Sequence, residues 1–211
     1  MTDWWWTILF CVLLCGATAY YCFYNDKTDF ELKCIVSDVN GKKYCVRNRE
    51  PEMEHKTADL LATVCQNLTY FVNTYLAEKH PNNPNVSRLR KNFRADKISE
   101  TLPNSIHTAY TEDKGVDTKL CLTIDKEDSK RIIDFHTLTF VALHELAHQM
   151  TEETGHPPAF WNNFVFLLQN AKSAGVHKPI DYSKQPRKYC GLPITNNPYF
   201  SQQQKQKQKQ N

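Results

Sequence analysis

The sequence predicts an α+β protein made of one N-terminal membrane-spanning helix and a small domain in which helices pack with a short β-sheet. Three observations support this fold class. The 21 residues from Trp4 to Tyr24 carry no charge, three later segments have apolar residues at helical spacing, and two short segments are β-prone. A length of 211 residues fits one globular domain with an attachment and is too short for two large domains.

The uncharged N-terminal run is long enough to cross a membrane. A helix rises about 1.5 Å per residue, and the hydrocarbon core of a bilayer is about 30 Å thick. A cleaved signal peptide is the alternative, because Ala17-Thr18-Ala19 has the small-x-small form of a cleavage site. The anchor is favoured, since no Lys or Arg precedes the run and apolar residues continue to Tyr24. We therefore expect residues 1–25 to be a transmembrane anchor with aromatic belts at both ends.

Positive charges follow the run but do not precede it. The lysines soon after it are Lys27, Lys33, Lys42 and Lys43. Because Lys and Arg are enriched on the cytoplasmic side of membrane proteins, the C-terminal part is predicted to be cytoplasmic. A lumenal or secreted location is the less favoured alternative.

The compartment also decides the state of the cysteines. Those beyond the run are Cys34, Cys45, Cys65, Cys121 and Cys190. They include no Cys-x-x-Cys pair, so neither a zinc ribbon nor a redox motif is expected. In a reducing compartment they would be ordinary thiols, whereas in a lumen up to two disulfides could form. Asn67 and Asn85, each within an Asn-x-Ser/Thr sequence, could then carry glycans.

The chain has 26 Lys and Arg against 23 Asp and Glu, and this small excess lies in its tail. Residues 201–211 form a Gln/Lys repeat without an apolar side chain, which is typical of a disordered segment. The remainder is close to neutral. Its composition therefore predicts no basic surface for nucleic acid, and nothing in it indicates an oligomeric state.

The first elements after the anchor are a hairpin and a long helix. Residues 26–50 form a juxtamembrane segment with a predicted β-hairpin, because Asn40-Gly41 is a strong hairpin-turn signal between two apolar stretches. Residues 54–79 have an apolar stripe at helical spacing that ends before Pro81. Residues 86–93 are expected to add a short helix, and its interspersed basic residues are interpreted as a solvated face.

The second half of the chain is predicted to begin with strands and continue with two helices. Residues 105–111 and 118–124 are expected to be strands joined by a polar loop around Lys114-Gly115. Residues 135–150 indicate a largely apolar helix capped near Asp134.

A turn over residues 151–155 is expected to lead to the second helix. Pro157 and Pro158 suit the first positions of this helix, which should stop at Gly175. Residues 176–200 are expected to be irregular but packed.

The segment that carries chemistry is His144-Glu145-Leu146-Ala147-His148. Residues four apart on a helix lie one above the other, so both imidazoles would point at one place with Glu145 beside it. Two neutral imidazoles can bind Zn²⁺, and the carboxylate is placed to take a proton from metal-bound water. Inside an apolar helix these three polar side chains would be costly without a metal to use them.

A third protein ligand has to come from outside this motif, because catalytic zinc usually has three protein ligands and one open position. Glu152 is a poor candidate, since with His144 and His148 it would form a helical column about 12 Å long. His156 is better placed, because Gly155 allows the chain to reverse just before the next helix.

These residues resemble a known family. The His-Glu-x-x-His helix, followed by Gly155-His156-x-x-x-Phe160-Trp161, is similar to the minimal zincin metallopeptidases of the SprT-like and WLM groups, which are related to Spartan. The resemblance is firm over residues 136–168. It implies a zincin-like domain over residues 51–200, Zn²⁺ ligation by His144, His148 and His156, and Glu145 as general base and acid.

A second resemblance concerns the anchor and the C-terminal segment. Tyr189-Cys190-Gly191 and Asn197-Pro198-Tyr199, together with the N-terminal span, resemble uncharacterised membrane-anchored metallopeptidases encoded by large DNA viruses. This implies a viral protein whose domain faces the cytoplasm or the virion interior. The DNA-repair role of SprT-like proteins is not carried over, because this chain has an anchor and a near-neutral domain.

The expected function is therefore a membrane-anchored zinc metalloendopeptidase that cleaves proteins or peptides near its membrane. Candidate donors to the developing oxyanion are His136, Tyr182 and Tyr189, and each is at least as well explained by packing. Asp181 is a candidate to orient a ligating histidine.

Two other expectations accompany this function. Phe160, Trp161 and Phe164 are interpreted as core contacts between the two helices. The alternative functions are a non-catalytic structural or adaptor protein on a zinc-stabilised scaffold, and a membrane protein whose tail recruits partners.

Overall fold

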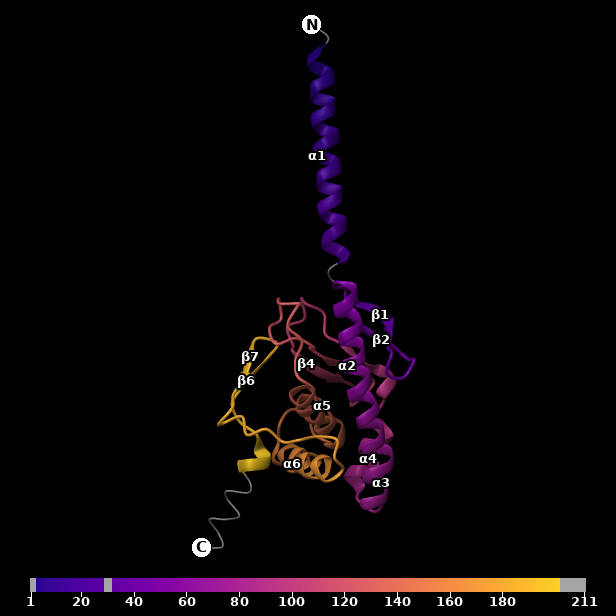
Figure 1. The fold of residues 1–211 in the computed structure, drawn as a ribbon, viewed down its shortest axis with the longest axis vertical. Helices are drawn as coiled ribbons and strands as arrows, with labels where there is room; N and C mark the ends of the chain where they lie inside the picture. Colours follow the sequence, from indigo (N-terminus) through magenta and orange to yellow (C-terminus); the bar gives the residue numbers. More distant parts are fainter. Residues whose placement is uncertain (1–2, 29–31, 202–211) are drawn as a thin grey trace.

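The computed structural model describes residues 3–28 and 32–201, and within them the chain is a mixed helix and sheet protein (Figure 1). The predicted α+β class is thereby confirmed. Of the tail predicted to be disordered, residues 202–211 lie outside the described residues.

Helix α1 spans Asp3–Thr28 and stands apart from the other elements in Figure 1. Its 18-residue window Trp4–Tyr21 has a mean hydropathy of 1.4, and none of it is buried by the rest of the described chain. Such a helix is long and apolar enough to cross a membrane, although a signal sequence meets the same criteria.

Strands β1 (Leu32–Val36) and β2 (Lys43–Arg47) form the expected antiparallel hairpin. The connection is longer than the two-residue turn that Asn40-Gly41 suggests. Ser37 Oγ and the Asp38 amide both donate to Asp59 on the following helix, at 2.5 and 2.9 Å, and this tethers the loop there. A disulfide joins Cys34 and Cys45, which face each other across the two strands.

The long predicted helix is formed, but it contains an irregular turn. Helix α2 (Pro51–Tyr70) passes into the π-helical segment η1 (Phe71–Tyr75) and ends as α3 (Leu76–Lys79). Helix α4 covers Pro84–Asn92, where the side chain of Asn83 accepts hydrogen bonds from the first free amides.

One residue of α4 departs from the interpretation as a solvated face. Arg88 donates to the Met150 carbonyl at 3.2 Å and pairs with Glu152 at 3.1 Å. It therefore ties α4 to the chain at the end of the helix that carries His144 and His148.

A three-stranded sheet forms the centre of the β-structure. Strand β5 (Asp117–Leu120) lies between β3 (Ile98–Glu100), which is parallel to it, and β4 (Ala109–Glu112), which is antiparallel. Strands β4 and β5 correspond to the two predicted strands, and β4 is an edge strand. Strand β3 was not predicted, because three residues are too few to show an alternating pattern. It is preceded by η2, a 3₁₀ turn over Ala95–Lys97.

Helix α5 spans Phe135–Met150 and occupies the middle of the domain. The Asp134 carboxylate accepts from the Thr137 amide at 2.9 Å, which confirms the predicted cap. The helix packs against α2, α4, β4 and α6 (Pro158–Ser173), so almost all of its faces are buried. Helix α6 ends before Gly175, as predicted, where a positive φ turns the chain away.

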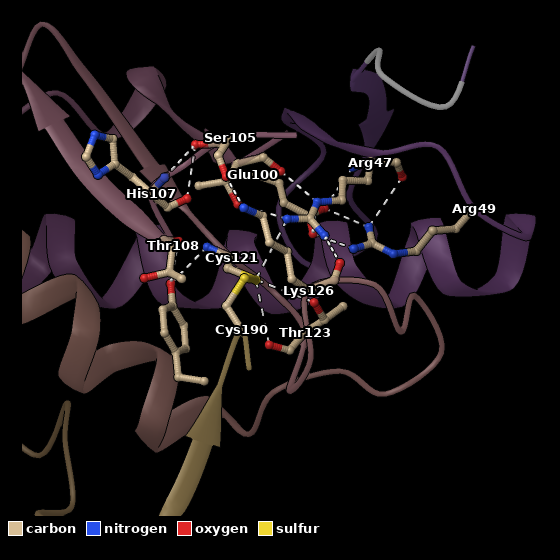
Figure 2. Close-up of a disulfide and its surroundings, with 12 residues drawn as sticks. Arg47, Arg49, Glu100, Ser105, His107, Thr108, Cys121, Thr123, Lys126 and Cys190 are labelled. Carbon is tan, nitrogen blue, oxygen red and sulfur yellow. Dashed lines mark hydrogen bonds and ion pairs between the residues drawn. A yellow bond between two sulfur atoms is a disulfide. The ribbon is translucent and has the colours of Figure 1, made fainter. Parts of the chain in front are cut away.

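The C-terminal segment is packed, as expected, but it also contains a small hairpin of β6 (Arg187–Tyr189) and β7 (Leu192–Ile194). A disulfide between Cys121 and Cys190 attaches this hairpin to the end of β5 (Figure 2). The remaining cysteine of the domain, Cys65, is buried and free.

A buried ionic cluster lies near the same disulfide (Figure 2). Glu100 pairs with Arg49 and also accepts from the Arg47 amide at 2.7 Å, while the Arg47 side chain donates to the Thr101 carbonyl at 2.6 Å. These contacts join β2 to the sheet. Because each charged group has partners, the cluster avoids the cost of an unpaired buried charge.

Candidate metal centre

The last two turns of α5 place two histidines on one face of the helix. His144 and His148 are one turn apart, and their ring centroids are 5.0 Å apart. Both are half-buried, whereas the residues between them are buried. The two imidazoles therefore open towards the surface at the end of an otherwise enclosed helix.

The turn after α5 brings a third imidazole to the same place. Gly155 has a φ of 75°, a left-handed value that residues other than glycine rarely adopt, and the chain reverses there. Pro158 then starts α6 at its first position. As a result, His156 Nε2 lies 3.1 Å from His144 Nε2, and one ring nitrogen from each of the three histidines lies within 4.8 Å of the others.

These three nitrogens fit a tetrahedral metal ion. Nitrogen ligands at about 2.1 Å from a tetrahedral ion lie about 3.4 Å from one another, which is within the observed range of spacings. Burial, with a smaller contribution from neighbouring positive charge, lowers the pKa of His144 to about 3 and of His148 to about 4. At neutral pH both imidazoles are therefore uncharged, which is the form that binds metals.

A buried aromatic ring packs against all three imidazoles. Phe160 is fully buried, and its ring centroid lies 4.5 Å from those of His148 and His156 and 4.9 Å from that of His144. Phe164, one turn later on α6, contacts His144 at 5.3 Å. The expectation that Phe160 and Phe164 pin the two helices together is confirmed.

The same expectation is wrong for Trp161. Its side chain is 45% exposed, because it lies off the face of α6 that carries Phe160 and Phe164. Its ring centroid is 5.8 Å from that of His156. Trp161 therefore lies at the rim of the site and outside the core.

Glu145 is the carboxylate of the site. It is 4% exposed, and burial raises its pKa to about 7, an effect that a hydrogen bond from Thr111 partly opposes. Thr111 Oγ1 donates to Glu145 Oε2 at 3.1 Å. A carboxylate with a pKa near neutrality can both take up and release a proton under physiological conditions.

Glu145 and the three histidines line one cavity of about 480 Å³. Its opposite wall comes from β4 and from the loop between β4 and β5. The residues on that wall are Ala109, Tyr110, Thr111, Asp113 and Lys114. The cavity thus lies between an edge strand and the end of α5.

Lys114 connects this wall to the turn that carries the third histidine. Its ammonium group donates to the Thr151 carbonyl at 3.0 Å and to the Glu153 carbonyl at 2.8 Å. These carbonyls follow the C-terminus of α5, where a positive charge is favourable. The sequence predicts only a polar loop around Lys114-Gly115, since a contact to a distant carbonyl leaves no local pattern.

The three predicted oxyanion donors lie away from the cavity. Tyr189 is buried, and its hydroxyl accepts from the Cys121 amide at 2.8 Å and donates to the Thr108 carbonyl at 3.3 Å. The Tyr182 hydroxyl contacts Thr137, and His136 Nδ1, near the start of α5, accepts from the Lys178 amide at 3.3 Å. These side chains are engaged in packing, which is the alternative to oxyanion donation that the sequence also allowed.

Two further residues were considered for the site from the sequence, one as a partner of a ligating histidine and one as a ligand. Asp181 binds Ser183 and Lys184 beside it in the sequence and contacts none of the three histidines, so its predicted orienting role is wrong. Glu152 is exposed and pairs with Arg88, in agreement with its rejection as a ligand.

Comparison with known proteins links the chain to viral proteins. It is 31% identical over 186 residues to the uncharacterised protein R325 of Acanthamoeba polyphaga mimivirus, a match that covers 86% of this chain and 92% of R325. The chain belongs to the same family as R325. The predicted viral character therefore agrees with the sequence relationship.

Two further viral relatives match shorter parts of the chain. Uncharacterised protein 136R of Invertebrate iridescent virus 6 is 38% identical over 58 residues, and protein 042R of Invertebrate iridescent virus 3 is 39% identical over 66 residues. These matches cover 33% and 39% of those proteins. No protein-family model and no solved structure matches the chain. The function of this family therefore has to be inferred from the geometry of the site.

Proposed function

We propose that this chain is a membrane-anchored, zinc-dependent metallopeptidase with a zincin-like domain. One observation carries the proposal: three imidazoles converge beside a buried carboxylate in a single open cavity. This combination provides ligands for a metal, a base next to it, and space for a substrate.

The histidines would bind the metal, and Glu145 would transfer protons. His144, His148 and His156 would hold Zn²⁺, whose Lewis acidity would polarise a peptide carbonyl and lower the pKa of a bound water. Glu145 takes the proton of the attacking water and delivers it to the leaving amine, for which a pKa of about 7 is well suited. His144 and His148 are half-buried and His156 is exposed, so one side of the site is accessible from the cavity.

An extended peptide suits this cavity better than a compact ligand. Strand β4 is the edge of the sheet, and its residues 109–111 form one wall beside Glu145. A free strand edge offers backbone donors and acceptors to an added strand. A peptide paired with β4 would pass directly over the three histidines.

The proposed location is a membrane, with α1 as the tether. The orientation of α1 in the membrane stays a prediction, because two features of the chain favour opposite orientations. The lysines after α1 favour the cytoplasm or the virion interior, whereas two disulfides are typical of an oxidising compartment. A glycosylation acceptor sequence added after Asn211 decides between them, because a glycan is added only in the lumen.

A structural zinc site is the alternative proposal. It is favoured by one observation: the three imidazoles and Phe160 also join the end of α5 to the start of α6. An ion there would stabilise the domain without any catalysis. The chain would then be an adaptor or structural membrane protein.

The experiment that separates these proposals uses the full chain in detergent and measures zinc content, cleavage of an unfolded protein substrate, and thermal stability. For Glu145→Gln we expect one zinc per chain and at least about a hundredfold loss of cleavage. For His148→Ala we expect loss of both zinc and cleavage. Undiminished cleavage by Glu145→Gln would refute the peptidase proposal, and a wild type that binds zinc without cleaving would support the structural alternative.

A further inference from the structure

A line of polar side chains connects the sheet to Glu145. Gln149 Nε2 donates to Thr118 Oγ1 at 3.1 Å, the Thr118 and Thr111 hydroxyl oxygens lie 3.4 Å apart, and Thr111 Oγ1 donates to Glu145 Oε2 at 3.1 Å. Gln149, Thr118 and Glu145 are all buried. The line begins and ends on α5, where Glu145 and Gln149 are one turn apart.

The direction of these hydrogen bonds follows from the chemistry of the groups. The Gln149 NH₂ can only donate, and an ionised Glu145 carboxylate can only accept. Each threonine hydroxyl has one proton. While Glu145 is ionised, all three contacts are hydrogen bonds at the same time only if Gln149 donates to Thr118, Thr118 to Thr111, and Thr111 to Glu145.

The two threonines are held by the strands that carry them. Thr111 on β4 and Thr118 on β5 are direct partners in the antiparallel register, so their side chains lie on the same face of the sheet. This face is turned towards α5. The line thus passes from the helix through both strands and back to the helix.

The line leaves one oxygen of Glu145 available. Within residues 3–28 and 32–201, no donor reaches Oε1, and Glu145 lines the cavity. A carboxylate that could rotate freely would spread its two oxygens over many directions. With Oε2 held by Thr111, Oε1 is the oxygen left to face a water molecule in the cavity.

We infer that Thr111 is a positioning residue for Glu145, and that Thr118 and Gln149 set the direction of its hydroxyl. This inference rests on the proposed function, in which Glu145 is the base. It also gives β4 a second role, because the strand that offers its edge to a peptide holds the base at the same time. Positioning of this kind raises kcat without changing substrate affinity.

The hydroxyls are not needed to dock the β4–β5 loop. Gly115 lies so close to the Asn92 carbonyl that a Cβ there would be 2.4 Å from its oxygen, and Lys114 binds the carbonyls after α5. The strands are also paired through their backbones. Removal of a hydroxyl should therefore leave the fold intact.

The test compares Thr111→Val, which has nearly the same shape without the hydroxyl, with Thr111→Ser, which keeps it. In the full chain we expect Thr111→Val to lower kcat on the order of tenfold, with KM, zinc content and Tm unchanged. Thr111→Ser should retain kcat within about twofold. The matched control is Thr139→Val, since Thr139 is also buried but its hydroxyl donates to Phe135 of its own helix. A Thr111→Val enzyme with wild-type kcat would overturn the inference.

Thr118→Val tests the direction of the line. Thr111 can still donate to Glu145 in this variant, so its kcat should fall less than that of Thr111→Val. The double variant should be no slower than Thr111→Val alone, because both changes act through one hydrogen bond. Additive losses would contradict a single line of hydrogen bonds.

A measurement on the metal-free chain separates this inference from the proposed function. The infrared carboxylate band of Glu145, assigned by difference against Glu145→Gln, should shift in Thr111→Val and stay in place in Thr111→Ser. If the band behaves in this way but wild type cleaves no peptide, the hydrogen bond is established and the proposed peptidase function fails. An unshifted band in Thr111→Val would overturn the positioning role itself.

Discussion

At the scale of single residues, burial controls the protonation of the groups around α5. The same desolvation that lowers the pKa of His144 and His148 raises that of Glu145. Both effects favour the uncharged form of each group. The cavity therefore holds two uncharged imidazoles, those of His144 and His148, beside a carboxyl group whose pKa is close to neutral.

A histidine outside the site provides a test of this burial effect. His177 is 3% exposed, its ring nitrogens have no hydrogen-bond partner among the described residues, and burial lowers its pKa to about 4. A group with a lowered folded pKa stabilises the fold fully above its unfolded pKa of about 6.5. This stabilisation is lost as the pH falls from about 6.5 towards 4.

We therefore expect the Tm of the metal-free chain to fall between pH 7 and pH 4.5, and to fall several degrees less in His177→Phe. Thermal unfolding followed by circular dichroism measures this difference. His55→Phe is the control, because His55 is exposed. Equal pH dependence in wild type and His177→Phe would show that His177 is not buried as a neutral ring.

At the scale of elements, the site depends on how three segments meet: the end of α5, the turn with Gly155, and the β4–β5 loop. The loop holds the turn through Lys114, whose ammonium group binds two carbonyls there. Since His156 follows this turn, the position of the third imidazole depends on a side chain from the β4–β5 loop.

Lys114→Met should consequently weaken metal binding. We expect roughly a tenfold increase in the zinc dissociation constant, by analogy with the loss of other groups that support metal ligands. Lys114→Arg, which keeps the charge, should recover part of the affinity. Lys130→Met is the control, since Lys130 is exposed on a different loop. Competition with a chromophoric chelator measures the affinity, and unchanged binding in Lys114→Met would contradict this role.

The elements also show which features could be predicted from the sequence. Helices α5 and α6 were predictable because each combines an apolar stripe with local signals at its start, Asp134 and Pro158. The meeting of the three histidines was predictable because Gly155 marks a chain reversal close to the motif.

Other features depend on contacts between distant segments. Strand β3 and the β6–β7 hairpin have three residues per strand, and their pairing leaves no periodic pattern. Thr111 and Lys114 act on residues more than thirty positions away. The hydrogen bonds of the Tyr189 hydroxyl could not be predicted, because its partners, Thr108 and Cys121, lie far from it in the chain.

At the scale of the whole molecule, a domain of modest size carries two disulfides and follows an N-terminal helix that is long and apolar enough to cross a membrane. The Cys121–Cys190 disulfide closes a loop of 69 residues that includes α5 and α6, whereas Cys34–Cys45 spans only 11 residues. The longer loop removes more entropy from the unfolded chain. The whole site therefore lies within the segment that Cys121 and Cys190 enclose, apart from the wall supplied by β4 and the β4–β5 loop.

Replacement of both Cys121 and Cys190 by Ala should destabilise the domain more than replacement of Cys34 and Cys45. The entropy of loop closure predicts that the free energy of unfolding falls by about 4 kcal/mol without the Cys121–Cys190 bond and by about 3 kcal/mol without the Cys34–Cys45 bond. The Tm should fall in both cases. Differential scanning calorimetry of the full chain in detergent measures the order. A larger loss from the hairpin pair would show that loop length does not govern these two bonds.

The central claim is that three imidazoles of one chain hold a zinc ion with an open position. Zinc-edge X-ray absorption on the full-length Glu145→Gln variant, loaded with one equivalent of zinc, tests it most directly. Three nitrogen ligands with imidazole scattering at about 2.0–2.1 Å and one further light-atom ligand are expected, and His156→Ala should remove one imidazole. A spectrum with sulfur ligands, or one that His156→Ala leaves unchanged, would contradict the account.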